Sequence, residues 1–259
     1  MAEENRREKL QALISIYKKF LHTDEKTAIL AEKYKWELIT KCQNLSPTEV
    51  VAENLKIKDG HLFYNIASRT VFPEFIQNNE ARFSAIIENL WDEKVDLSKR
   101  LVDFETESKN FAEEIGHKGD ILPNDERSAA TLLCCHAPEI HTLFKNSFYQ
   151  ETCKYISEKP RPKREKYIHY LSIISDLGDL IKDDSEFIEK IRELTPNCIQ
   201  SNKLLAQNIL YVLFESGRNL VNLFTGEIKM SKTQEIVELL NSKKNIILQG
   251  APGTGKTYT

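Results

Sequence analysis

Four residues near the C-terminal end of the sequence have the types and spacing of a phosphate-binding loop. Gly250, Gly255, Lys256 and Thr257 satisfy the pattern GxxxxGK[ST] in full. Glycines let the backbone fold so that successive N–H groups point at phosphate oxygens, and the lysine supplies a mobile positive charge for the β and γ phosphates. The threonine hydroxyl can complete the coordination of Mg²⁺. We predict a nucleotide site formed by Gly250, Ala251, Pro252, Gly253, Thr254, Gly255, Lys256 and Thr257, in which Thr257 contacts Mg²⁺.

The segments around this loop have the character that such a loop requires. Ser231 can cap a short helix that is followed by the apolar run 245–249, which predicts a strand leading straight into Gly250. The helix that follows the loop would add its positive N-terminal end to the phosphate site. Because the sequence reaches Thr259 so soon, we expect an N-terminal part of a larger nucleoside triphosphatase. By itself it should be inactive, since hydrolysis also needs an acidic residue for Mg²⁺ and a group that positions water.

The segment from Gln249 to Tyr258, QGAPGTGKTY, resembles the start of an AAA+ module. Its GAPGTGKT form is similar to that of McrB-like AAA proteins, the motor subunits of modification-dependent restriction systems. The upstream stretch 138–155, which contains FKNSFY at 144–149, also resembles helical regions that precede the module in bacterial members. The motif-bearing part of the resemblance covers about residues 231–259.

This resemblance implies an assembly and a set of partners. It implies a homo-oligomeric ring driven by ATP or GTP with Mg²⁺, a separate nuclease subunit, and an N-terminal domain that recognises DNA or a partner protein. McrB itself prefers GTP, and this loop leaves the choice between GTP and ATP open. One alternative is an AAA+ ATPase of remodelling or chaperone type whose helical domain binds protein clients. A second is that the helical region works only as an interaction module, without a nucleotide role.

The composition favours long helices in a reducing compartment. The chain has 259 residues, 41% hydrophobic and 29% charged, with a formal net charge of −3 that gives no general attraction to nucleic acid. Nine glycines and eight prolines are few for an all-β fold. Five cysteines without a CxxC pair suit free thiols, and the charged N-terminus has no apolar signal region. No run reaches the length of a membrane span. We expect a cytoplasmic protein that does not enter the membrane.

Apolar periodicity predicts a mainly α-helical N-terminal domain over residues 1–225. The segment 226–259 should hold a linker and the truncated start of an α/β AAA+ domain. Residues 97–115 have apolar positions at alternating spacings of four and three, which fits either a coiled-coil seam or, better, a helix packed in a bundle. Residues 61–71 fit a loop or a short strand. The predicted helices cover about 3–21, 23–39, 46–55, 83–91, 97–115, 126–135, 147–157, 167–181 and 200–214, the last apolar on nearly all sides and therefore central.

A basic run lies between two of these helices. Six cations from Lys154 to Lys166 are offset by two glutamates, with tyrosines 155, 167 and 170 interleaved. Such a patch can contact a phosphate backbone while the aromatic rings stack on bases, although a solvated loop has the same composition. Residues 92–126 carry eleven acids against five bases and could dock this run or a partner. The candidate nucleic-acid contacts are Lys159, Arg161, Lys163, Arg164 and Lys166.

Cysteine and histidine residues also gather in the sequence between residues 134 and 153. Zinc sites need spacings that let four ligands converge, whereas adjacent cysteines on a helix point to different sides. We interpret these residues as small buried thiols beside ordinary histidines. The residues concerned are Cys134, Cys135, His136, His141 and Cys153. No catalytic triad order, HExxH motif or paired-carboxylate signature is present, so we predict no catalytic residue in the helical region.

Overall fold

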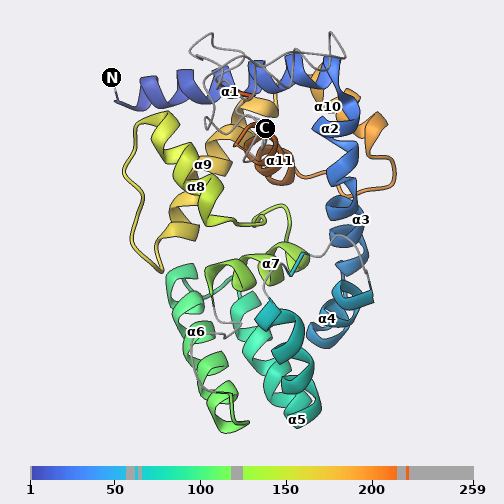
Figure 1. Cartoon of the computed structure of the whole chain (residues 1–259), viewed down its shortest axis with the longest axis vertical. Coiled ribbons are helices and arrows are strands. Elements are labelled where there is room, and N and C mark those ends of the chain that lie inside the picture. Colours follow the sequence, from blue (N-terminus) through green and yellow to red (C-terminus); the bar gives the residue numbers. More distant parts are fainter. Residues whose placement is uncertain (1, 57–61, 64–65, 118–124, 215–219, 222–259) are drawn as a thin grey trace, which may run out of the picture. The chain divides into compact units, whose positions relative to one another are not determined.

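The computed structural model describes residues 2–56, 62–63, 66–117, 125–214 and 220–221. The chain divides into two compact units, Met1–Leu220 and Val221–Thr259, and the described residues belong almost entirely to the first. The prediction of a mainly α-helical unit is confirmed, and no strand occurs within these residues (Figure 1). The predicted boundary between residues 225 and 226 lies outside them.

Eleven α-helices and one 3-10 helix occur within the described residues. In chain order they are α1 (Ala2–Thr23), α2 (Glu25–Ala28), the 3-10 helix η1 (Leu30–Glu32), α3 (Lys33–Cys42), α4 (Pro47–Lys56), α5 (Ile66–Trp91), α6 (Leu97–Glu114), α7 (Glu126–His136), α8 (Asn146–Ile156), α9 (Lys166–Ile181), α10 (Ser185–Leu194) and α11 (Asn202–Phe214). Among them, none combines the length and apolar character needed to cross a bilayer.

Helix α11 lies at the centre of this unit, as its apolar sequence predicts. It packs against α1, α8 and α9, and Figure 1 shows α1 crossing these helices. Even its polar residue Asn208 is buried, with 1% of its surface exposed. The Asn208 amide donates to the hydroxyl of Tyr17 and to the carbonyl of Ala28, both at 2.8 Å. This amide therefore ties the central helix to α1 and to the end of α2.

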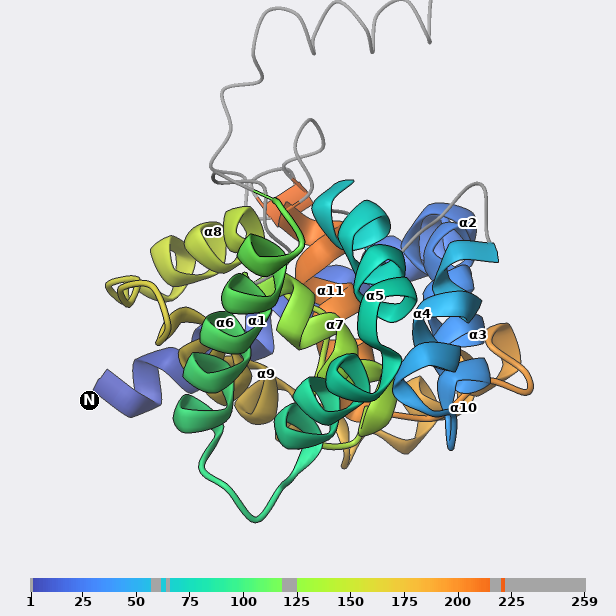
Figure 2. The same cartoon turned by 90° about the horizontal axis from the view of Figure 1, so that it is seen from below.

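Helices α5 and α6 form an antiparallel pair, visible side by side in Figure 2. The rings of Phe75 and Phe111 stack with their centroids 4.4 Å apart, and Phe72 and Phe83 extend the cluster. The apolar seam of residues 97–115 thus faces a neighbouring helix of the same chain, which confirms the bundle interpretation over the coiled coil.

The start of α4 shows how the sequence sets a helix boundary. Ser46 and Glu49 exchange hydrogen bonds in a capping box, from the Ser46 N–H to the Glu49 carboxylate at 2.9 Å and from the Glu49 N–H to the Ser46 hydroxyl at 3.4 Å. Pro47 takes the first helical position, where its missing N–H leaves no bond unmade. The predicted helix from Ser46–Pro47 to about residue 55 is confirmed.

Other helix predictions are wrong in part. The single helix predicted from Thr23 is divided into α2, η1 and α3, because Ile29 has a non-helical backbone (φ −136°, ψ −45°). Its cap is Asp24, whose carboxylate accepts from the Thr27 N–H at 2.9 Å. Residues 66–71 belong to α5, not to a loop or a strand. Helix α10 was not predicted at all.

Candidate functional site

The predicted nucleotide loop, 250–257, lies outside the described residues, as do the predicted strand 245–249 and the helix before it. The nucleotide site therefore remains a prediction from the sequence. The described residues include the predicted nucleic-acid contacts, the cysteines and histidines between 134 and 153, and positions 92–117 and 125–126 of the acidic segment.

The basic run forms a connection between α8 and α9, here called the basic loop (residues 157–166). The loop leaves α8 through Ser157, which has a left-handed backbone (φ 61°), and the Glu158 N–H closes the helix end by donating to the Cys153 carbonyl at 2.8 Å. The Glu158 carboxylate then receives the guanidinium of Arg6 from α1 at 3.1 Å. These contacts fix where the loop begins.

A chain of hydrogen bonds holds the middle of the basic loop. The backbone N–H of Arg161 donates to the Tyr149 hydroxyl at 2.7 Å, which leaves the hydroxyl hydrogen for Nδ1 of His169 at 2.9 Å. The other ring nitrogen, Nε2, then donates to Glu158 at 2.8 Å. Burial raises the pKa of Tyr149 to about 12, so this hydroxyl stays protonated at neutral pH. The side chains of Lys159 and Arg161 remain exposed on the outside.

The end of the basic loop is held by one carboxylate of α6. Lys163 Nζ lies 2.5 Å from one oxygen of Glu105, and Arg164 Nε lies 2.8 Å from the other. Partial burial tends to raise the pKa of Glu105, but the hydrogen bonds from the two cations outweigh it and the pKa is lowered. The acidic segment therefore docks the basic run at this residue, which was one of the expectations from the sequence.

The tyrosines interleaved with the cations do not face the solvent together. Tyr167 and Tyr170 are buried, with 0% and 1% of their surface exposed, and Tyr155 packs against the ring of Phe214. Tyr167 and Tyr170 are therefore not available to stack on bases, which was one of the two alternatives for this run. The signal was present in the sequence, since these two tyrosines continue the apolar face of α9 at helical spacing.

The five cysteine and histidine residues between 134 and 153 lie in different surroundings. Cys134 and Cys135 are buried in α7, where burial raises the pKa of the Cys134 thiol, and a hydrogen bond that the Cys135 thiol donates to Cys42, together with burial, raises that of Cys135. His136 stacks against a tryptophan ring on α5. Within the part of the chain that the structure describes, no group of three or more His, Cys, Asp or Glu side chains could hold a metal ion.

A polar network that the sequence did not reveal surrounds the buried side chain of His141. Its Nε2 lies 2.8 Å from Glu93, and the same carboxylate accepts both terminal nitrogens of Arg100 at 2.8 Å. On the other side, Nδ1 of His141 lies 3.4 Å from the Tyr167 hydroxyl. The network joins the α5–α6 connection, the α7–α8 connection and α9. It therefore stabilises the position of α9, the helix that follows the basic loop.

This network gives a pH dependence of stability that can be measured. Burial lowers the pKa of His141 more than its hydrogen bond to the Glu93 carboxylate raises it, whereas the unfolded chain keeps a value near 6.5. Below that value the unfolded state binds more protons, so the free energy of unfolding should fall as the pH drops, by at most about 1.4 kcal/mol per pH unit for one proton. Chemical unfolding between pH 7.5 and 5.5 should show a smaller slope for His141→Gln. An unchanged slope would contradict this assignment. The pKa of His136 is also lowered, so His136→Gln measures how much of the slope comes from that histidine.

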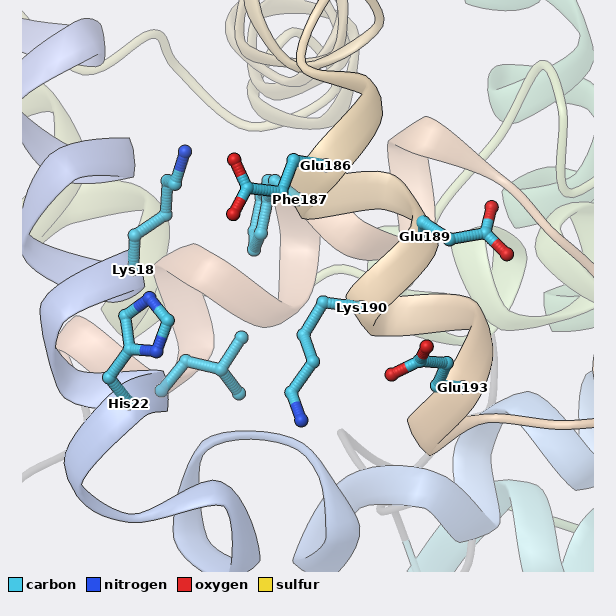
Figure 3. Close-up of a pocket in the computed structure, with 8 residues that line it drawn as sticks. Lys18, His22, Glu186, Phe187, Glu189, Lys190 and Glu193 are labelled. Carbon is cyan, nitrogen blue, oxygen red and sulfur yellow. The ribbon is translucent and has the colours of Figure 1, made fainter.

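A groove lies between α1 and α10 (Figure 3). It has a volume of about 410 Å³. Leu21 and Phe187 form its apolar floor, and both are nearly fully buried. Phe187 rests edge-on against Tyr17, with ring centroids 6.0 Å apart. Its lining consists of Lys18, Leu21, His22, Glu186, Phe187, Glu189, Lys190 and Glu193.

Both lysines that line this groove form ion pairs, whereas two of its glutamates form none with the described residues. Lys18 pairs with Asp184 at 2.6 Å, and Lys190 pairs with Glu25 at 2.5 Å, so carboxylates outside the lining neutralise both lysines. The glutamates 186 and 193 form no ion pair with the residues that the structure describes. The groove therefore keeps a negative rim above an apolar floor.

No protein-family model, curated protein or solved structure matches this chain.

Proposed function

We propose that this chain belongs to an AAA+ nucleoside triphosphatase that acts as the motor subunit of an McrB-like restriction system. The observation that carries the proposal is the complete phosphate-binding motif 250–257, preceded by an apolar segment of strand character. In this proposal Lys256 contacts the β and γ phosphates, and Thr257 holds Mg²⁺ beside them. The nucleotide is ATP or GTP, and the partners are a nuclease subunit and further copies in a ring.

The helical unit would recognise DNA. The basic loop supports this part of the proposal, because Lys159 and Arg161 are exposed on a backbone held at both ends. Positive side chains on an ordered loop can contact phosphates without base specificity, whereas target choice would need contacts with base edges. Two further candidate contacts, Lys163 and Arg164, are engaged with Glu105 in the structure.

Nucleotide binding is tested with Lys256→Ala in a protein that carries this chain together with the rest of the nucleotide-binding domain. Fluorescent ATP and GTP analogues with Mg²⁺ should bind the parent protein, and the substitution should weaken binding at least about tenfold, since a charge-assisted contact to phosphate is lost. Lys244→Ala removes a lysine just outside the motif and should leave binding unchanged. Equal affinities of the Lys256→Ala variant and the parent protein would refute the nucleotide site.

The second candidate is an AAA+ remodelling ATPase whose helical unit binds protein clients. The groove between α1 and α10 favours it, because a negative rim above an apolar floor complements a segment with an apolar side chain next to lysine or arginine. The two candidates differ in what weakens binding. Glu186→Gln with Glu193→Gln should reduce capture of a basic amphipathic peptide, whereas charge reversal at Arg161, Lys163 and Arg164 should reduce capture of DNA. The helical unit binds protein clients if only the first pair has an effect.

A further inference from the structure

The contact between Glu105 and the basic loop has the form of a phosphate site. One oxygen of the carboxylate faces the Lys163 ammonium at 2.5 Å and the other faces the Arg164 guanidinium at 2.8 Å. Lysine and arginine hold phosphate oxygens by the same charge-assisted hydrogen bonds at the same distances. A carboxylate of the protein thus occupies the place between the two cations that a phosphate group would take.

The three partners differ in how far they reach the solvent. The Glu105 side chain is 14% exposed, whereas those of Lys163 and Arg164 are 65% and 56% exposed. The carboxylate is therefore anchored against the protein, and the cations cover it from outside. Exposed cations of this kind gain little from an ion pair and change partner easily, because water screens the attraction and the long side chains keep alternative conformers.

The backbone under these cations is already in place. Arg164 has a left-handed backbone (φ 77°), and the Glu165 N–H donates to the Pro162 carbonyl at 3.2 Å, which closes a turn just before α9. Pro160 and Pro162 restrict the chain further, and the Tyr149 hydroxyl holds it at Arg161. A loop that is ordered before it binds loses little conformational entropy when a ligand arrives.

The cations stand close together in the sequence of this ordered loop. Lys159 and Arg161 are exposed and make no ion pair with a described carboxylate, and Lys163 and Arg164 follow within three residues. A single small anion can use only the pair at Glu105, whereas a chain of phosphates can engage all four cations at once. Each such contact also releases a counterion from the nucleic acid, which favours a polyanion over the single carboxylate.

We propose that the basic loop is a surface for the phosphate backbone of duplex DNA, and that Glu105 acts as an internal competitor that DNA displaces from Lys163 and Arg164. The proposal rests on the DNA-binding part of the proposed function and adds its regulation: Glu105 lowers the affinity for DNA, most strongly at low salt. It does not involve the nucleotide loop, so its failure leaves the test of Lys256 unaffected.

The test is Glu105→Gln in the full chain, with a fluorescein-labelled 20-base-pair duplex as the probe in anisotropy titrations. At about 50 mM salt the variant should bind at least about fivefold more tightly than the parent chain, because two cations no longer face an internal carboxylate. The gain should shrink towards about 300 mM salt, where phosphate contacts weaken. Glutamine keeps the size and the hydrogen-bonding oxygen, and thermal unfolding verifies that the variant is folded.

The matched control is Glu107→Gln. It makes the same change in net charge on the same helix, but Glu107 is exposed and forms no ion pair with the basic loop within the described residues. It should alter DNA affinity less than about twofold. If Glu107→Gln gives the same gain as Glu105→Gln, the effect comes from overall charge and the proposal is overturned.

Two further measurements test which cations bind DNA and whether the loop prefers DNA to a small anion. Adding Lys163→Ala and Arg164→Ala to the Glu105→Gln variant should cancel the gain, and a gain that persists without these cations overturns the proposal. Inorganic phosphate at matched ionic strength should compete poorly with the duplex, since it meets only two of the four cations. Competition as strong as that of unlabelled duplex would make the loop a small-anion site, and DNA binding by neither the parent chain nor Glu105→Gln would overturn the proposal as well.

Discussion

Glu93→Ala should lower the free energy of unfolding by about 3 kcal/mol, the low end of the range for breaking a buried ion pair. The substitution leaves the guanidinium of Arg100, whose side chain is only 4% exposed, with the Leu90 carbonyl as its remaining described acceptor. It also removes the partner of His141 Nε2. The low end applies because Glu93 itself is 36% exposed, so water can compensate part of the loss. Urea unfolding followed by circular dichroism measures the change.

Two variants test the cause of this effect. Glu88→Ala removes an exposed carboxylate from α5, the helix just before Glu93, and should change the free energy of unfolding by less than about 0.5 kcal/mol. In an Arg100→Met background, the cost of Glu93→Ala should fall well below its cost in the parent chain, because no buried charge is then left without a partner. Equal costs in both backgrounds would show that Glu93 acts independently of Arg100.

The helices with strong apolar periodicity were predictable, and those with few buried residues were not. Residues 200–214 are apolar on nearly all sides, and they form the buried α11. In α10 only Phe187 and Ile191 are buried, so the pattern is short, although Asp184 supplies a regular cap to the Phe187 N–H. A periodic apolar pattern reveals a helix only when the helix buries residues from several turns.

Helix interruptions were the second source of error. The first half of α5 escaped prediction because Pro73 and the non-helical Asn79 (φ −161°, ψ 87°) divide its pattern. Asn79 restarts the helix by accepting from the Arg82 N–H at 3.0 Å, so the periodic residues that follow resemble a separate helix. The break at Ile29 similarly depends on packing around α2, which propensity does not encode.

In the candidate site, too, contacts that depend on tertiary packing could not be predicted from the sequence. The sequence placed the cations of the basic loop and the acidic segment correctly as complementary, but it could not identify Glu105 among eleven acids in residues 92–126. That choice depends on α6 lying beside the loop, a contact between residues 58 and 59 positions apart. The network of Glu93, Arg100 and His141 depends on tertiary packing in the same way, so no local motif announces it.

Asn208→Asp should also lower the free energy of unfolding strongly, by an amount that depends on pH. Asn208 is 1% exposed, its amide nitrogen donates to the Tyr17 hydroxyl and the Ala28 carbonyl, and its Oδ1 accepts no hydrogen bond from the described residues. An aspartate of nearly the same shape would place a carboxylate against the Ala28 carbonyl oxygen. Burial should raise the pKa of this carboxyl by about three units above its unfolded value near 3.9.

The direction of this pH dependence follows from the difference in proton binding between the folded and the unfolded variant. Because the folded variant would hold its proton to higher pH than the unfolded chain, its stability should decrease as the pH rises from about 4 to about 7. Relative to the parent chain, the loss should be about 4 kcal/mol at pH 7.5 but only about 1.5 kcal/mol at pH 5, where the protonated carboxyl can donate to Ala28. Urea unfolding at both pH values measures it. Asn110→Asp, on the exposed face of α6, should show almost no loss at either pH. Equal losses for Asn208→Asp at the two pH values would mean that the buried site tolerates the charge, and would contradict the predicted rise of the carboxyl pKa.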